Sequence, residues 1–443
     1  MEITPTSVWQ KGRLVFKAVF IGILTLLLLI PMAFISNIVT DREQRQKEAY
    51  NEVAGKWAAA QTVTGPLLLV PYVVHTGGKD APDVTVTRYA VFLPDSLNVT
   101  GNLQPEKRHR GIYEVILYRS GLRLSGNFRN MDPAALKIPP GDWRSSDAVL
   151  VLGITDLRGI ENRLSVRWNG TEKSFDPGTP DAGLIPQGVS VPVPLDSGGI
   201  AGTDIPFSVD LDLKGSGTLS IVPVGKSTTV HLDSPWPTPS FTGGFLPSTR
   251  TLSEKGFSSD WTIFNLNRNF PQQWRDGGYK MENSAFGVSL MQPVDFYQKS
   301  MRCVKYAILI IALTFTVFFL LETGTKNPVH AFQYLLVGLA LCVFYTLLIS
   351  ISEYLDFSWA YGISAAATVG LITLYASWLF AKRRMALVTG AALVVLYGYV
   401  FVLMQLKDFA LLVGSIGLFV ILGVLMYFSR HINRETIPDQ IPV

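Results

Sequence analysis

Glu353 and Asp356 are the residues whose setting most suggests chemistry. They stand between two long apolar runs in LLISISEYLDFSWAYGISAAAT (residues 347–368). Carboxylates inside a bilayer usually belong to a proton or ion path, whereas carboxylates between two spans lie in a hydrated turn. A charge at the bilayer centre costs roughly 2.5–3.5 kcal/mol even on the lenient insertion scale. We therefore favour the turn. The alternative is that Glu353 lies in a protein-lined cavity, and it therefore remains a candidate binding residue.

The other polar residues form no recognisable catalytic or metal site. The sequence contains no G-x-S-x-G elbow, H-E-x-x-H pair, P-loop or dinucleotide fingerprint. In ITDLRGIENR, Asp156, Arg158 and Gly159 predict a salt-bridged turn, and LKGSGTL (213–219) predicts a hairpin turn. We therefore predict no catalytic residue, no metal, no cofactor and no enzyme activity. The five histidines are scattered without ligand spacing: His75, His109, His231, His330 and His431.

A proline-rich strap, SPWPTPSFTGGFLPSTR (234–250), is the candidate binding segment. Its three prolines preclude regular helix and central strand, while Trp236, Phe241 and Phe245 still need burial. One interpretation is a strap studded with aromatic side chains and packed over a sheet. The other is a peptide- or glycan-binding surface in which these three rings are stacking platforms.

The composition is that of a membrane protein. The 443 residues are 48% hydrophobic and only 16% charged, with a mean hydropathy of +0.28, whereas soluble domains carry about 25% charged residues. The net charge of +4 and the lack of a basic stripe argue against nucleic-acid binding. Cys303 and Cys342 lie in or beside apolar runs, which predicts buried apolar side chains rather than ligands or a disulfide.

Six stretches are long enough to cross a bilayer as helices, which requires about 20 apolar residues each. The first lacks a cleavage site and is interpreted as an uncleaved anchor. No comparable run lies between residues 41 and 301. The predicted spans are about 14–35, 304–321, 331–351, 357–380, 385–404 and 409–428.

Basic residues in the short loops predict the orientation, because Lys and Arg accumulate on the cytoplasmic side. Lys326, Lys382–Arg384, Arg430 and Arg434 fall on one side, and only Lys407 falls on the other. Both termini are therefore expected in the cytoplasm, and the lipid bilayer is the first partner. The expected parts are a cytoplasmic N-terminus (1–13), a span (14–35), a helical stalk (36–64), an exported domain (65–302), a five-helix bundle (303–429) and a cytoplasmic tail (430–443).

The exported part has the sequence pattern of strands. Val209, Leu211 and Leu213 alternate with Asp210, Asp212 and Lys214, so one strand face lies in a core and the other in water. Short β-branched segments separated by turn residues predict an antiparallel sandwich or barrel-like domain between spans one and two. Gly65-Pro66 is expected to end the stalk helix.

Several segments resemble one family, the CreD family of bacterial inner-membrane proteins, also called cell-envelope integrity proteins. The similarity runs from the stalk to about Tyr375, and its most specific part is the block of the second and third spans. The segments are GPLLLVPY, GIYEVILYRSGLRLSGNF, GITDLRGIENRLSVRWNG, SPWPTPSFTGGFLP, FGVSLMQPVDFYQKSMRCVKYAILIIALTFTVFFLLE and QYLLVGLALCVFYTLLISISEY.

The resemblance implies a Gram-negative inner membrane location and a periplasmic domain. It also implies expression linked to a two-component system and altered tolerance to certain colicins and β-lactams. It implies no catalytic residues. We expect a non-enzymatic factor of the envelope stress and integrity response, whose exported domain binds a periplasmic protein, peptidoglycan or lipid. The alternatives are a transporter or lipid-handling protein that uses the helix bundle with Glu353, and an envelope hydrolase.

Overall fold

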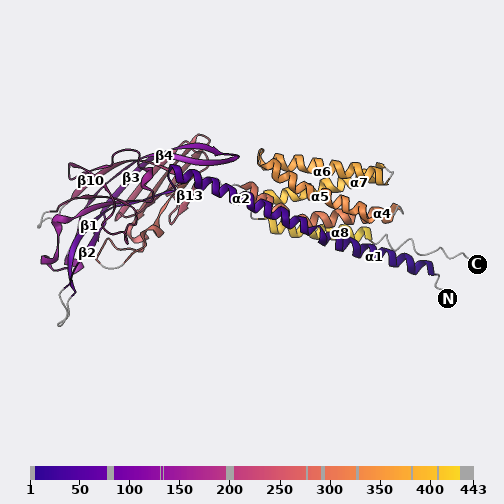
Figure 1. The fold of residues 1–443 in the computed structure, drawn as a ribbon, viewed down its shortest axis with the longest axis horizontal. Helices are drawn as coiled ribbons and strands as arrows, with labels where there is room; N and C mark the ends of the chain where they lie inside the picture. Colours follow the sequence, from indigo (N-terminus) through magenta and orange to yellow (C-terminus); the bar gives the residue numbers. More distant parts are fainter. Residues whose placement is uncertain are drawn as a thin grey trace, which may run out of the picture. The chain divides into compact units, whose positions relative to one another are not determined.

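A computed structural model describes residues 5–76, 84–129, 131–132, 134–195, 204–275, 278–290, 295–325, 329–380, 383–406 and 409–429. The chain divides into two compact units. We call Gln46–Pro293 the β-rich unit, and Met1–Arg45 together with Val294–Val443 the membrane unit. The labels of Figure 1 are used for the helices and strands.

One sheet of the β-rich unit is built around its first strand. β1 (Gln61–Thr76) pairs with β11, β5 and β2, and the strand order is β13-β17-β11-β1-β5-β9-β8, with β2 joining β1 to β16. The other strands of this sheet are β2 (Val84–Phe92), β5 (Val149–Ile154), β8 (Asp176–Pro177), β9 (Gly188–Pro192), β11 (Thr218–Val222), β13 (Ser240–Gly243), β16 (Gln273–Trp274) and β17 (Phe286–Ser289).

The second sheet has the order β14-β15-β12-β3-β4-β10-β6-β7. Inward residues of both sheets, such as Leu68 and Val151 from the first and Leu124 and Val209 from the second, form one hydrophobic core. The unit is therefore a two-sheet β domain. The strands of the second sheet are β3 (Ser96–Arg110), β4 (Tyr113–Phe128), β6 (Ser165–Trp168), β7 (Thr171–Ser174), β10 (Ile205–Ser216), β12 (Ser227–Ser234), β14 (Thr249–Ser253) and β15 (Gly256–Phe264).

Two features of the sheets differ from the sequence-based prediction. β1/β11 and β3/β12 are parallel pairs, so the sheets are mixed rather than purely antiparallel. LKGSGTL is not a hairpin turn, because β10 and β11 belong to different sheets. Gly217, at φ 66°, lies where the chain leaves one sheet for the other, and its positive φ favours glycine.

The stalk is shorter than expected. The chain begins with α1 (Pro5–Leu27) and α2 (Leu29–Trp57), and β1 already starts at Gln61. Gly65-Pro66 therefore lies inside a strand and does not end the helix. The register of β1 against β5 shifts between Thr64 and Leu67, and such an irregularity is where a strand accommodates a proline. Pro31 accounts for the interruption between α1 and α2, since it has no N–H to donate to the Leu27 carbonyl.

The membrane unit continues with apolar helices after the β-rich unit (Figure 1). The second of the expected spans is a bent pair, α3 and α4, with an angle of 45° between them. Helix therefore begins at Asp295, before the expected boundary at 302/303. The helices are α3 (Asp295–Lys305), α4 (Ala307–Thr325), α5 (Ala331–Ser352), α6 (Phe357–Phe380), α7 (Arg383–Gln405) and α8 (Ala410–Ser429).

Among the described residues, four helices are long and apolar enough to cross a membrane, and five are if the bent pair counts as one span. A shorter apolar helix covers Leu412–Val424. On α6, Trp359 and Trp378 are both 72% exposed and stand 19 residues apart, about 28 Å along a helix. Tryptophans gather at both bilayer interfaces, about 30 Å apart. This spacing therefore matches a helix that spans the hydrocarbon core.

Candidate functional site

The three aromatic residues of the strap are turned toward the core of the β-rich unit. Trp236 is 7% exposed, and its indole N–H donates to the Thr238 carbonyl at 3.2 Å. Phe241 packs edge-on against Trp261 at 5.8 Å between ring centroids, and Phe245 packs against Phe286 at 5.9 Å. This geometry is that of the packed strap. Little ring surface is left to stack against a bound peptide or glycan, which was the other interpretation.

Glu353 lies at the C-terminal end of α5, in the turn before α6. Its side chain is only 8% exposed, and its Oε1 is 3.4 Å from Arg42 Nε. In the same turn Asp356 accepts a hydrogen bond from the Ser358 backbone N–H at 2.9 Å, at the start of α6. Glu353 and Asp356 thus lie in the turn between α5 and α6, and Glu353 is paired with Arg42 of α2.

Asp156 organises the point where α2 gives way to the β-rich unit. Its carboxylate accepts from the Ala59 N–H at 2.9 Å and from Arg158 Nη2 at 2.7 Å and Nε at 2.9 Å. Hydrogen bonding to Arg158 holds the pKa of this 8% exposed carboxyl below its usual value. Arg158 Nη1 also donates to the Gly55 carbonyl, one of the carbonyls that a helix C-terminus leaves unpaired. The expected salt-bridged turn is confirmed, and it also caps a helix.

Two further polar side chains form hydrogen bonds at this junction, one to the end of α2 and one to the backbone of Asp156. Ser216 Oγ donates to the Ala58 carbonyl at 2.8 Å. Gln61 Nε2 donates to the Asp156 carbonyl at 2.9 Å, and its Oε1 accepts from the Asp156 N–H at 3.1 Å. Each of these polar groups has a hydrogen-bond partner in the protein, so the residues stabilise the fold at this junction. We call Gln61, Asp156, Arg158 and Ser216 the junction cluster.

Trp57, the last residue of α2, is surrounded by cations of the β-rich unit. Arg108 and Arg119 each lie 5.2 Å from the centroid of its ring, and Lys214 lies 4.9 Å away. Each such contact contributes about 0.5–1 kcal/mol at an exposed site. Together with the junction cluster, these contacts fix the end of α2 on the sheet from which Arg108, Arg119 and Lys214 project.

A second charged cluster lies inside the membrane unit and was missed by sequence analysis. Glu322 was expected in a turn, but it is part of α4 and 9% exposed. It forms an ion pair with Lys17 of α1 and accepts from the Tyr334 hydroxyl at 2.8 Å and from the Val329 N–H at 2.9 Å. Lys17 also donates to the Val329 carbonyl at 2.7 Å. We call Lys17, Glu322 and Tyr334 the membrane cluster.

Within the described residues, no group of three or more His, Cys, Asp and Glu is placed to hold a metal ion. Cys303 and Cys342 are buried free thiols, as predicted. His231 Nδ1 lies 2.6 Å from Asp260 Oδ1, on the paired strands β12 and β15. His431 lies outside the described residues.

The sequence is similar to known proteins along nearly its whole length. The family model described as "Inner membrane protein CreD" matches residues 13–435. A curated protein from Escherichia coli (strain K12), also named inner membrane protein CreD, is 34% identical over 429 residues, covering 96% of this chain and 94% of that protein.

A comparison with solved structures gives a much weaker likeness. An M1 zinc metallopeptidase from Deinococcus radiodurans aligns with a TM-score of 0.19 at 12% identity, over 39% of each chain. A score this low does not establish a shared fold, and no functional argument rests on it.

Proposed function

Because this chain belongs to the CreD family of inner membrane proteins, we propose that it is a non-enzymatic six-span protein that serves the envelope stress and integrity response from the inner membrane. The β-rich unit is proposed to lie in the periplasm and to bind an envelope partner. The observation that supports the proposal is that α2 is bonded at two places. Its Arg42 pairs with Glu353 of the membrane unit, and its C-terminal end accepts hydrogen bonds from Arg158 and Ser216 of the junction cluster. One helix thus attaches a large β domain to a membrane bundle.

The six-span count is supported by adding two elements to the four long helices. The bent pair α3 and α4 supplies one crossing, and α8, with its apolar stretch Leu412–Val424, supplies the other. An even number of crossings places both termini on one side of the membrane. With six crossings, the loop that contains Arg383 and Arg384 lies on the same side as the termini. Its basic residues favour the cytoplasm for that side.

A reporter fusion tests this topology. Alkaline phosphatase fused after residue 150, in β5, is expected to be active, because the enzyme folds only in an oxidising compartment. The same reporter fused after Arg384 is expected to be inactive and serves as the matched control. Activity is measured in intact cells and normalised to the amount of fusion protein. A phosphatase that is inactive at 150 and active at 384 would reverse the proposed orientation.

An exposed edge strand makes a protein the favoured partner among the three expected classes. β14 ends the second sheet, and all five of its residues are exposed. Its free backbone groups match an extended peptide, which adds to a sheet edge as a further strand. Stacking platforms for sugars are less well supported, because the aromatic rings of the strap face the core.

Apolar side chains near this edge strengthen the same proposal. Leu252 of β14 is 50% exposed, and Leu246, just before β14, is 73% exposed. Phe264, at the end of β15, is 52% exposed. Ser248 N–H donates to the Asp260 carbonyl, and Ser248 Oγ accepts from Thr262 N–H, so Leu246 and Phe264 lie toward the same end of the strand pair. We call β14 with Leu246 and Phe264 the edge surface.

Photocrosslinking in intact envelopes tests the edge surface. A photoreactive residue at Leu246 or at Leu252 is expected to capture an envelope protein. The same residue at Glu172, exposed on β7 at the opposite edge of this sheet, is the control. Leu246→Lys with Leu252→Lys should lower the yield from a crosslinker at Phe264 about tenfold, which corresponds to about 1.4 kcal/mol lost from the two apolar contacts together. Equal capture from both edges would contradict the proposal.

The alternative function, transport or lipid handling by the bundle, receives less support from Glu353. Its carboxylate lies at a helix end beside Arg42, where it is compensated rather than free to exchange an ion. We propose that it positions α2. A Glu353→Gln variant with unaltered envelope phenotype would count against transport by the bundle.

A further inference from the structure

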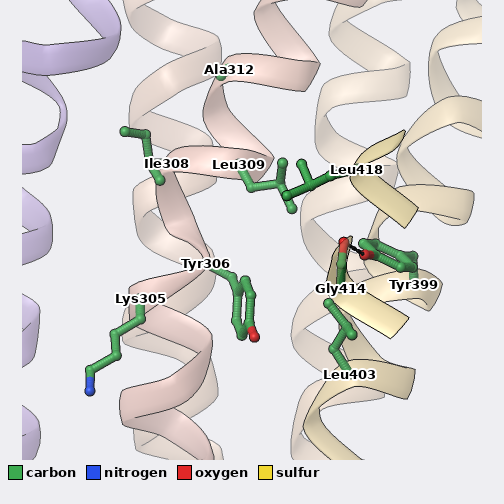
Figure 2. A pocket seen from close by; sticks show the side chains of 9 residues that line it. All are labelled: Lys305, Tyr306, Ile308, Leu309, Ala312, Tyr399, Leu403, Gly414 and Leu418. Carbon is green, nitrogen blue, oxygen red and sulfur yellow. Dashed lines mark hydrogen bonds between the residues drawn. The ribbon is translucent and has the colours of Figure 1, made fainter. Parts of the chain in front are cut away.

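An apolar groove lies on the membrane unit between the α3–α4 bend and helices α7 and α8. Its volume is about 410 Å³, within the range of roughly 300–1,000 Å³ typical of ligand sites. Leu309 and Ala312 of α4 line one wall, and Leu403 of α7 with Leu418 of α8 line the other (Figure 2). Ile308, also in the lining, is 45% exposed, so the groove opens to the outer, apolar surface of the bundle.

The polar groups of the groove gather at one end. Figure 2 shows Tyr306 in the gap between α4 and α8, and Lys305 at the same level, with its ammonium directed outward, away from α8. Tyr399 is occupied, because its hydroxyl donates to the Gly414 carbonyl at 3.0 Å. Toward Ala312 and Leu418 the lining is apolar. The groove is therefore lined mainly by apolar side chains, and its few polar ones, Lys305, Tyr306 and Tyr399, lie away from Ala312 and Leu418.

Two cations of α3 accompany the groove: Lys305 is part of its lining, and Arg302 precedes Lys305 on the same helix. Arg302 and Lys305 are one helical turn apart on α3, and neither makes an ion pair with any residue that the structure describes. Lys17, a partly buried cation of the membrane unit, is by contrast paired with Glu322. This pair of positive charges at the end of an apolar groove is complementary to an anionic headgroup.

The position of Lys305 along the helix fits the depth of such a headgroup. It ends α3 just before α4, whose first residue, Ala307, precedes Glu322 of the membrane cluster by 15 residues, about 22 Å along the helix. The hydrocarbon core is about 30 Å thick, so a lysine at this distance reaches the opposite interface with its flexible stem. The apolar lining then lies at the depth of acyl chains.

We infer that this groove is a binding site for one anionic glycerophospholipid. An acyl chain lies along Leu309, Ala312 and Leu418, and the phosphate is bound by Arg302 and Lys305, with the Tyr306 hydroxyl as a further donor. The site is independent of the proposed periplasmic partner, because every residue that forms it belongs to the membrane unit.

The test uses the full-length protein in nanodiscs of equal parts phosphatidylglycerol and phosphatidylcholine, with a photoreactive form of one or the other lipid. Crosslinks are mapped by mass spectrometry. Photoreactive phosphatidylglycerol is expected to label α4 and α8 about tenfold more than photoreactive phosphatidylcholine. Arg302→Gln with Lys305→Gln should remove that preference, because each cation near an anionic lipid surface contributes several-fold in affinity.

Matched variants separate this site from general lipid contact. Ala312→Phe fills the groove and should lower labelling by both lipids, whereas Gly362→Phe adds the same bulk on α6, where a side chain meets open space, and should change nothing. Arg383→Gln with Arg384→Gln removes two charges at the start of α7 and should leave labelling intact. The inference would be overturned if both lipids labelled the protein equally, or if labelling persisted in Ala312→Phe. Equal losses of labelling in the control variants would also overturn it. Protection of Cys303 and Cys342 from thiol reagents shows that each variant is folded.

Discussion

Replacing Asp156 with alanine is expected to destabilise the β-rich unit by about 3 kcal/mol. The carboxylate accepts hydrogen bonds from the Ala59 N–H and from three nitrogens of Arg158, and hydrogen bonds to a charged group contribute roughly 1.5–3 kcal/mol each. Its loss also frees Arg158, which caps the Gly55 carbonyl at the end of α2. For a unit of this size the change corresponds to a fall in Tm of roughly 6–12 °C.

The measurement is the thermal unfolding of the full-length protein, followed by tryptophan fluorescence. Asp210→Ala is the matched control, because Asp210 forms an equally short ion pair with Arg123 at 2.6 Å but both side chains are about 70% exposed. Exposed pairs contribute about 0–1 kcal/mol, so this control should unfold close to the wild type. Equal Tm losses in the two variants would show that the junction cluster has no special role.

The same carboxylate should make stability depend on pH in acid. Hydrogen bonds from Arg158 lower the pKa of Asp156 in the folded state, so the stability it provides is present above the pKa of the unfolded chain, about 3.9. That stability is lost as the pH falls through the lowered, folded pKa. Asp156→Asn should show a smaller fall in Tm between neutral pH and acid than the wild type.

Local patterns in the sequence predicted local structure well. The alternation in residues 205–216 predicted which side chains of β10 face the core, and Val209, Leu211 and Leu213 are buried while Asp210 and Asp212 are exposed. The prolines of the strap likewise predicted an irregular segment whose aromatic rings need burial. Both inferences depend only on residues near each other in the chain, where steric and solvation effects act directly.

Partners distant in the sequence were not predictable in this way. Asp156 receives a bond from Ala59, 97 residues away, and Glu322 pairs with Lys17, 305 residues away. Glu322 follows an apolar run, so its sequence setting predicted a hydrated turn. Only the fold shows that α4 continues past it and that α1 supplies a cation. The parallel pairing of β1 with β11 is equally a property of topology rather than of local sequence.

The two charged contacts of the first helices suggest how the N-terminal segment belongs to the membrane unit. Lys17 and Arg42 are 25 residues apart, about 37 Å along a helix, and each is bonded to a carboxylate of the bundle. A bilayer with its interfacial regions is about 40–45 Å thick. The first span is therefore held near both interfaces and acts as a member of the bundle rather than as a separate anchor.

This attachment predicts a large effect for Lys17→Met. The substitution leaves Glu322 without its cation in a site that is 9% exposed, and removal of one partner from a buried ion pair costs about 3–5 kcal/mol. Cys303 and Cys342, the only two cysteines of the chain, are buried in the membrane unit. Their reaction with a thiol-specific dye on heating therefore reports the unfolding of this unit alone.

The double variant Lys17→Met with Glu322→Gln decides whether charge is the cause. Glutamine keeps one carbonyl oxygen, which can accept from the Val329 N–H, and its NH2 group can donate to the Tyr334 hydroxyl oxygen. It carries no charge to be compensated, so the double variant should recover most of the lost Tm. Arg384→Met, which removes an exposed cation from the start of α7 in the same unit, is the control and should unfold like the wild type. A double variant as unstable as Lys17→Met would mean that the packing of the lysine stem, and not the buried carboxylate, holds α1 against α4.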